Sequence, residues 1–455
     1  MRQIEFDELG WLFVIRLSAV VAVQHLATCW ELQKGRESIV TNTLLQRVSK
    51  TFLRAPRAAL TFVAMLGFGV VTTQSAQAQF GDFALLYHFT GPDGNSPFGG
   101  VIQDGAGNVY GTTAFGGAYN AGTVFKVDTN DSEAVLHSFQ GGSDGAYPFA
   151  GLVQDAAGNL YGTTEFGGTG GIGTVFKVDT SGSETVLQSF GGGSSGAYPT
   201  GGLLLDKAGN LYGASLGGSS GSQSDFFGDV FEVFSGGGIT VLHYFAGGPT
   251  DGASPDYSGL LVDKAGNFYG VTELGGADNL GAVYELSPSG TETLLHSFVG
   301  GTKDGCLPFG TPFMDEQGNL YGTTYACGSF NQGIVWKLST KGTETVLHNF
   351  DTNGSSDDGA YPFAGVIQDK AGNLYGTTCG GGNSRSQGTL YQLTPTGRLT
   401  VLHTFFVEND GVCPRAGVIQ DAQGNLYGTV PETDHNDNDY GSVWEYIPLV
   451  TATVN

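Results

Sequence analysis

The chain has 455 residues, with 19 lysine and arginine residues against 43 aspartate and glutamate residues, and a net charge of −24. This acidity argues against nucleic acid and anionic membrane surfaces as partners, since both require clustered basic side chains. Glycine contributes 76 residues without the three-residue period of collagen, and a hydrophobic content of 40% is ample for a packed core. The composition therefore indicates a turn-rich β protein.

The first 78 residues differ in charge from the rest of the chain. They hold eight basic and five acidic residues. The rest of the chain therefore holds 11 basic and 38 acidic residues and has a net charge of −27. Within this segment, three basic residues precede an apolar run at 58–71, and the small-residue sequence Ala-Gln-Ala follows at 76–78. This order is typical of a secretory signal peptide, and the apolar run is too short to span a membrane. We expect a signal peptide at 48–78, preceded at 1–47 by an over-extended gene start or a disordered leader.

The motif D-x-x-G-N-[LVF]-Y-G recurs seven times beyond this segment. Its tyrosines lie 51 to 57 residues apart and are Tyr110, Tyr161, Tyr212, Tyr269, Tyr321, Tyr375 and Tyr427. Each unit holds four short β-type runs, here named strands A to D, separated by glycine turns; in the second unit they fall at 151–155, 159–164, 174–178 and 185–190. Four strands in a unit of this length predict the blade of a β-propeller.

The two ends of the repeat array complement each other. The segment 84–89 reads as a D strand with no A, B or C strand before it, whereas the last unit stops after its C strand at 443–446. Pairing of these segments completes a seventh blade and covers an open sheet edge. The alternative fold, a solenoid, needs distinct capping units at its two ends, whereas the ends here fit each other. We therefore predict an all-β, seven-bladed propeller over 79–455, with four-stranded blades at about 97–139, 148–190, 199–245, 255–298, 308–350, 362–405, and 414–446 together with 84–89.

The second unit, at 155–190, contains D-x-x-G-N-L-Y-G-T-T, then G-G, G-T-V-F-K-V and T-V-L-Q-S-F. These segments resemble the Gloeobacter–Verrucomicrobia-type (GloVer) tandem repeat of choice-of-anchor proteins, and the resemblance covers about 83–446 in all seven units. It implies an exported propeller, usually with a variable surface anchor, although no anchor sequence follows the last repeat here. The resemblance brings no established activity and no catalytic residues, so it leaves the function open.

Residues that recur in every unit are expected to build the blades. The B-strand tyrosines, the C-strand aromatic residues and the D-strand phenylalanines should pack between blades. We expect each D-strand histidine to make a structural hydrogen bond, because the outer strands of different blades lie too far apart to share one metal ion; these are His137, His243, His296, His348 and His403. The aspartate before each Gly-Asn pair should cap a tight A–B turn, with calcium binding as the weaker alternative.

In this topology the D–A and B–C loops emerge on one face, and their length and variability make it the expected functional face. Four cysteines lie in these loops, and we predict the disulfides Cys306–Cys327 and Cys379–Cys413, against the alternative of free thiols. Six D–A aspartates either cap turns, the interpretation that we favour, or form an acidic mouth around the channel: Asp93, Asp144, Asp251, Asp304, Asp358 and Asp410.

Departures from the repeat supply the candidate site. In three units the usual phenylalanine after the proline is replaced, by Thr200, by Asp256 with Tyr257, and by Arg415. Two unusual B–C loops lie at 217–229 and 431–440. The candidate binding residues are Asp256, Tyr257, Arg415, Phe226, Phe227 and Tyr440. Oxygen donors at alternate positions, Asp434, Asn436 and Asn438, resemble the start of a calcium loop, but its glycine and closing glutamate are missing, so a solvated acidic loop is favoured.

The sequence contains no Ser–His–Asp order, phosphate loop or H-E-x-x-H motif, so it names no catalytic residues. We expect an exported, periplasmic or extracellular, monomeric binding module for a glycan, a cell-surface component or a protein partner. No cofactor is expected, with calcium as the weaker alternative. A secreted polysaccharide lyase or glycoside hydrolase that uses non-repeated carboxylates at the channel mouth is the alternative function. A purely structural envelope protein is the third.

N-terminal sequencing of the exported protein should give a mature chain that begins just after residue 78, because the Ala-Gln-Ala sequence precedes that point. A mature chain that keeps the segment 11–30 would contradict both the signal peptide at 48–78 and the interpretation of residues 1–47.

Overall fold

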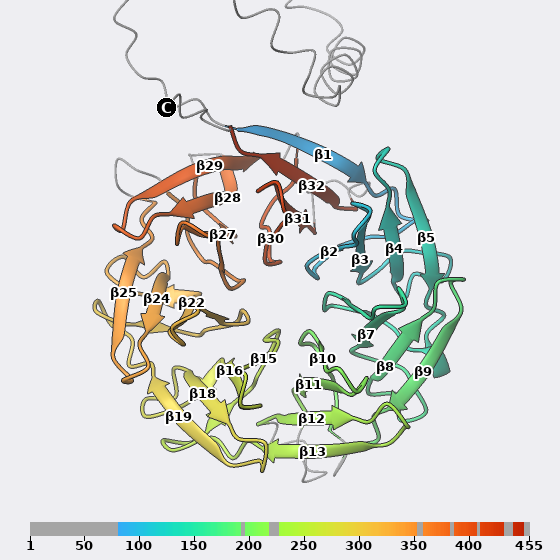
Figure 1. The fold of residues 1–455 in the computed structure, drawn as a ribbon, viewed down its shortest axis with the longest axis horizontal. Helices are drawn as coiled ribbons and strands as arrows, with labels where there is room; N and C mark the ends of the chain where they lie inside the picture. The colour runs from blue at the N-terminus through green and yellow to red at the C-terminus, as the bar shows by residue number, and fades with distance from the viewer. Residues whose placement is uncertain are drawn as a thin grey trace, which may run out of the picture. The chain divides into compact units, whose positions relative to one another are not determined.

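The computed structural model of the chain describes residues 81–192, 196–217, 227–352, 358–382, 386–406, 410–431 and 440–449. The predicted signal peptide and the segment before it lie outside the described residues. Within these ranges, seven four-stranded antiparallel sheets stand around a central axis (Figure 1). The fold is therefore the predicted seven-bladed β-propeller. Among the described residues, no helix is long and apolar enough to cross a membrane.

Each blade runs from a two-residue inner strand A to a long outer strand D. Blades one and two comprise β2 (Ile102–Gln103), β3 (Val109–Thr113), β4 (Thr123–Val127) and β5 (Glu133–Ser138), then β6 (Val153–Gln154), β7 (Leu160–Thr164), β8 (Thr174–Val178) and β9 (Glu184–Ser189). Blades three and four comprise β10 (Leu204–Leu205), β11 (Leu211–Ser215), β12 (Asp229–Val233) and β13 (Ile239–Tyr244), then β15 (Leu261–Val262), β16 (Phe268–Thr272), β18 (Ala282–Leu286) and β19 (Glu292–Ser297).

The remaining blades follow the same order. Blades five and six comprise β21 (Phe313–Met314), β22 (Leu320–Thr324), β24 (Ile334–Leu338) and β25 (Glu344–Asn349), then β26 (Ile367–Gln368), β27 (Leu374–Thr378), β28 (Ser386–Leu393) and β29 (Leu399–Phe406). Blade seven comprises β30 (Ile419–Gln420), β31 (Leu426–Val430), β32 (Ser442–Ile447) and β1 (Asp82–His88). The predicted strands lie within one to three residues of the observed ones.

Blade seven is closed by the two ends of the described chain, as predicted. Figure 1 shows β1 in blue along the outside of β32 in dark red. The two strands pair antiparallel from Asp82 opposite Ile447 to His88 opposite Ser442, with a bulge between Leu85 and Tyr87. The edge of β32 is therefore covered, and blade seven has four strands like the other blades.

Aromatic side chains join every blade to the next. The D-strand phenylalanine of one blade meets the C-strand aromatic ring of the following blade edge-to-face or tilted, with ring centroids 5.0 to 6.0 Å apart. The pairs are Phe89–Phe125, Phe139–Phe176, Phe190–Phe231, Phe245–Tyr284, Phe298–Trp336, Phe350–Tyr391 and Phe405–Trp444. Each pair contributes about 0.5–1.5 kcal/mol beyond the burial of its area. The predicted packing of aromatic residues between blades is confirmed.

The glycine of each Tyr-Gly pair makes room for the C-strand ring. A Cβ atom at Gly111 would lie 2.6 Å from the Phe125 ring, and one at Gly428 would lie 2.4 Å from the Trp444 ring. Real Cβ atoms do not approach so closely, so the repeated glycine is a packing requirement.

The aspartates before Gly-Asn cap the A–B turns, as predicted. Asp104 accepts hydrogen bonds from the backbone N–H groups of Ala106 and Asn108, both at 2.9 Å, and from the Tyr110 hydroxyl at 3.0 Å. Burial alone would raise the pKa of Asp104, but hydrogen bonds from Asn108 lower it below its usual value.

Asp229 is an exception to the pattern of the C strands. Its slot holds threonine in blades one, two and six, where the hydroxyl bonds to a B-strand threonine, as Thr174 does to Thr164 at 2.8 Å. The Asp229 side chain is fully buried, and among the described residues neither of its oxygens has a hydrogen-bond partner of normal geometry. Burial raises the pKa of Asp229 to about 8, although the adjacent Ser215 hydroxyl acts to lower it.

Replacing Asp229 with threonine should stabilise the propeller. Because the pKa of Asp229 rises from 3.8 in the unfolded chain to about 8, the native protein loses stability as pH increases through this interval. We expect D229T to raise the free energy of unfolding at pH 8 by about 1–3 kcal/mol, as measured by urea denaturation, and by less at pH 5.

The matched control places aspartate in the equivalent slot of blade two. T174D should lower the free energy of unfolding, and the loss should grow from pH 5 to pH 8. A D229T protein that is less stable than the wild type at pH 8 would contradict this account of Asp229.

Candidate functional site

Each D–A loop ends in a residue of left-handed backbone conformation that is followed by proline. The φ angles of these residues lie between 54° and 59°, and the residues are Ser96, Tyr147, Tyr198, Ser254, Leu307, Tyr361 and Cys413. A left-handed non-glycine residue costs about 1–3 kcal/mol and persists only where its surroundings fix it. Tyr147 shows how this happens, because its N–H donates to the Ala121 carbonyl at 2.9 Å while its carbonyl accepts from the Glu165 N–H at 3.1 Å. In five blades the residue after the proline thereby lies at the channel mouth: Phe98, Phe149, Thr200, Phe363 and Arg415.

The channel mouth opens into a pocket of about 400 Å³ that is lined by residues of all seven blades. Its deeper wall consists of glycine and aliphatic residues next to the A strands, such as Gly151, Val366 and Val418. Larger side chains gather where the D–A loops end. This pocket therefore lies on the propeller axis, on the face that the sequence identifies as functional.

Five side chains form a closed circle around the pocket, here called the mouth circle: Phe98, Phe149, Tyr257, Phe363 and Arg415. Ring centroids are 5.4 Å apart for Phe98 and Phe149, 6.3 Å for Phe149 and Tyr257, and 5.7 Å for Tyr257 and Phe363. The Arg415 guanidinium closes the circle, since its central carbon lies 5.5 Å from the Phe363 ring centroid and 5.3 Å from that of Phe98. These distances are typical of cation–π contacts.

Tyr257 enters the mouth circle because blade four carries one extra residue after its proline. Asp256 takes the sequence place of the usual phenylalanine, and Tyr257 follows with a φ of 52° and 39% of its surface exposed. The Thr200 hydroxyl donates to an Asp256 carboxylate oxygen at 2.9 Å. The Asp256 side chain is thus held beside blade three, while the Tyr257 ring lines the pocket.

Three carboxyl groups lie near Tyr257 and influence one another, and none of them is among the described residues that line the pocket. Burial raises the pKa of Asp256 to about 6, and the charge of Glu273 adds to this effect. Burial raises the pKa of Glu165 to about 7, and the charge of Asp256 raises it further. Burial also raises the pKa of Glu273. Near neutral pH, therefore, protonated and ionised carboxyl groups coexist beside Tyr257.

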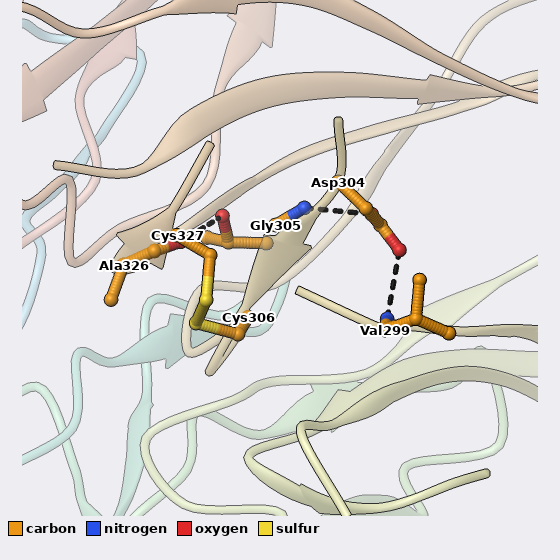
Figure 2. The surroundings of a disulfide bond; sticks show 7 residues. Val299, Asp304, Gly305, Cys306, Ala326 and Cys327 are labelled. Atoms are coloured by element: carbon orange, nitrogen blue, oxygen red, sulfur yellow. Dashed lines mark hydrogen bonds between the residues drawn. A yellow bond between two sulfur atoms is a disulfide. The ribbon is translucent and has the colours of Figure 1, made fainter. Parts of the chain in front are cut away.

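Both predicted disulfides are present. Cys379–Cys413 joins the D–A loop that carries Arg415 to the B–C loop of blade six, and the Arg415 Nε–H donates to the Cys413 sulfur at 3.4 Å. Cys306–Cys327 joins the short paired strands β20 (Gly305–Cys306) and β23 (Ala326–Cys327) in blade five, as Figure 2 shows. The first disulfide thus helps to fix the one cation of the mouth circle.

The other predicted binding residues lie elsewhere. Tyr440 packs beside Phe89 and Val443 in the hydrophobic cluster between blades seven and one. Phe227 is 37% exposed and lies next to Gly247 of a D–A loop. Neither is among the described residues that line the pocket. Phe226 and the suggested calcium donors Asp434, Asn436 and Asn438 lie outside the described residues.

The D–A aspartates cap turns, which is the interpretation that the sequence favoured. Asp304 accepts hydrogen bonds from the Val299 N–H at 2.8 Å and the Gly305 N–H at 2.7 Å (Figure 2). Five of the six aspartates lie beside D-strand histidines on the outer part of the blades, and Asp93 accepts a hydrogen bond from the Tyr87 hydroxyl. Among the described residues none of the six lines the pocket. The alternative, an acidic mouth formed by these aspartates, is therefore wrong for the described residues.

Glu165 and Glu273 are the residues that the sequence interpretation missed. Each directly follows a B strand, in a slot that holds Ala114, Leu216 or Tyr325 in other blades. They are the acidic residues of that slot, so a comparison of this position across the units would have identified them.

Comparison with known proteins agrees with the fold. The profile of the Gloeobacter/Verrucomicrobia repeat matches residues 69–261 and 219–444. The chain is similar to a solved structure of the extracellular domain of a B. thetaiotaomicron protein described as a hybrid two-component system, with 13% identity and a TM-score of 0.50. That match covers 81% of this chain and 41% of the other, so this chain spans less than half of that structure.

A second solved structure, described as a gluconolactonase, matches with 12% identity and a TM-score of 0.40, over 81% of this chain and 92% of the other. Identities this low reflect the fold alone, and no curated protein matches the chain. The repeat profile, by contrast, extends over most of the sequence and over every blade. The chain therefore belongs to the Gloeobacter/Verrucomicrobia repeat family.

Proposed function

We propose that this protein is an exported, non-catalytic module that binds a glycan at the mouth of the propeller channel. The observation that carries the proposal is the mouth circle of four aromatic rings and Arg415 around a pocket of about 400 Å³. A pocket of this size, lined by apolar groups with a few polar ones, is typical of a small-ligand site.

The chemistry of the mouth suits a sugar. Aromatic faces pack against the C–H groups of a pyranose ring, while hydroxyl groups need hydrogen-bond donors and acceptors nearby. Arg415 supplies donors at the pocket, and Asp256 and Glu165 supply carboxyl groups close to Tyr257. The blades hold these groups in place before a ligand arrives, which reduces the entropy lost on binding.

Export is supported by covalent chemistry. The disulfides Cys306–Cys327 and Cys379–Cys413 fit an oxidising compartment, since the cytosol keeps thiols reduced. The signal-peptide pattern at 48–78 points the same way.

A glycan array probed with the exported protein should identify a bound oligosaccharide. Y257A and R415A should each weaken its affinity at least tenfold, about 1.4 kcal/mol, because each removes a contact that the pocket presents to the ligand. Titration calorimetry with the best oligosaccharide measures this loss.

The matched control is Y119A, since Tyr119 is 59% exposed in a B–C loop and is not among the described residues that line the pocket. Its affinity should equal that of the wild type. An array without binding, or equal losses for Y119A and Y257A, would contradict the proposal.

A second function is suggested by the three carboxyl groups near Tyr257. A group with a pKa of about 7 beside one with a pKa of about 6 resembles the acid and base of a glycoside hydrolase or polysaccharide lyase. In this alternative, Glu165 donates a proton to the leaving oxygen and ionised Asp256 acts as the base.

If the protein cleaves the glycan that it binds, the rate should be highest between about pH 6 and pH 7, where Asp256 is ionised and Glu165 still holds its proton. E165Q should then lower kcat at least about 100-fold without a comparable loss of binding. E316Q, a change of an exposed A–B turn residue, should leave kcat unchanged. Absence of new reducing or unsaturated ends after long incubation of the wild type would exclude this second function for that glycan.

A further inference from the structure

A cluster of histidine and carboxylate ligands lies between the outer strands of blades three and four. His243 comes from β13, Asp251 from the following D–A loop and Glu292 from the start of β19. The His243 Nε2 atom lies 3.2 Å from an Asp251 carboxylate oxygen and 3.9 Å from a Glu292 carboxylate oxygen. One ligand atom from each residue lies within 4.8 Å of the other two.

The remaining polar contacts of this cluster orient its ligands. The Ala246 N–H donates to one Asp251 oxygen at 2.8 Å, and the Gly252 N–H donates to the other at 2.7 Å. The Gly252 N–H also lies 3.4 Å from the Glu292 Oε1 atom, so Glu292 Oε2 is the oxygen nearer to the imidazole. The three side chains are only 16%, 15% and 6% exposed. The cluster is therefore largely shielded from bulk water.

Two carboxyl groups and an imidazole this close need a cation or a proton between them. Ligands bound tetrahedrally to zinc at 2.0–2.2 Å lie about 3.3–3.6 Å from one another, a spacing near that of the His243 contacts. The nitrogen ligand favours a transition-metal ion over calcium or magnesium, which prefer oxygen ligands alone.

Equivalent junctions provide an independent observation. Among the described residues, buried polar atoms without a hydrogen-bond partner occur in His137, Asp144 and Glu184 between blades one and two, and in His296 and Glu344 between blades four and five. His348 and Glu133, at junctions that lack one ligand type, also have such an atom each. Unpaired buried polar atoms are costly unless an ion or a water molecule joins them. Histidine, aspartate and glutamate thus occur together at two further junctions, and each of these junctions has buried polar atoms without a hydrogen-bond partner.

At three junctions that lack one ligand type the glutamate slot is apolar, whereas at the junction where Tyr87 replaces the histidine the slot keeps Glu133. Leu399 occupies it opposite His348 and Asp358, and Ile239 occupies it in the blade that follows Gln188. Phe83 occupies it opposite His403, with the two rings stacked 3.6 Å apart. These junctions show that a blade still forms when an apolar side chain occupies the glutamate slot.

We propose that His243, Asp251 and Glu292 bind a transition-metal dication, of which zinc is the representative, and that this ion ties the outer strand of blade three to that of blade four. Two ionised carboxylates and a neutral imidazole balance the charge of the ion, and binding displaces the proton that the carboxyl groups otherwise share. The role is structural, and it is independent of ligand binding at the channel mouth.

The test titrates the metal-free full chain with zinc chloride, by calorimetry and by the shift of Tm. We expect zinc to bind and to raise the Tm, because an ion that binds the native state stabilises it. In H243Q and in E292Q, either one equivalent of zinc should no longer bind or the zinc affinity of this site should fall at least tenfold. Mutation of residues that only hydrogen-bond a metal ligand already lowers metal affinity 10–100-fold, so loss of a ligand should cost at least as much. E292L provides a variant whose fold is secure, because Leu399 fills the equivalent slot.

H348Q is the matched control, since His348 lies beside Asp358 at 2.9 Å but opposite Leu399. It should bind as many equivalents of zinc as the wild type, whatever its own Tm. Three results would overturn the proposal: no zinc binding by the folded wild type, equal loss of zinc in H348Q and H243Q, or an equal effect of calcium chloride.

Discussion

The contact between a D-strand phenylalanine and the C-strand ring of the next blade is the interaction on which the rest of the structure depends. It occurs at every junction, from Phe89–Phe125 to Phe405–Trp444, and so runs through the whole ring. The C-strand ring also lies against the glycine of its own B strand, which fixes the spacing within the blade. One aromatic layer therefore sets both the shape of a blade and the angle between blades. Because strand β1 brings Phe89 to blade one, the chain closes only when its first described strand pairs with its last.

A framework fixed in this way leaves the ends of the D–A loops free to differ in chemistry. Backbone hydrogen bonds hold the left-handed residue before each proline, with a disulfide in addition at Cys413, so the residue after the proline can change without loss of the blade. Phenylalanine occupies this place in blades one, two, five and six, whereas threonine, aspartate and arginine occupy it in the others. The repeat supplies the aromatic wall of the mouth, and its departures supply the polar groups. The chemistry of the mouth therefore depends on a few side chains on a common scaffold.

The repeat period and the complementary chain ends were sufficient to predict the propeller, its closure and both disulfides. Those features follow from strand order, which the sequence displays directly. The mouth could be predicted only in part: Arg415 and Tyr257 stand out as departures, but the left-handed turn that places Tyr257 rather than Asp256 at the pocket depends on one inserted residue. Tyr440 looked equally unusual in sequence, yet its ring packs in the core because blade one lies beside it. The cluster around His243 could not be predicted, because its glutamate comes from the next blade, and its approach depends on the angle between blades.

The central claim is that the mouth circle, where the repeat is least regular, is the binding site. A crystal structure of the mature chain with its best oligosaccharide tests this claim most directly. We expect a sugar ring against Tyr257 and Phe363, with a hydroxyl or carboxyl group of the ligand bound to Arg415. An oligosaccharide bound on the outer strands or on the face of the A–B turns, with the mouth circle free of it, would contradict the account.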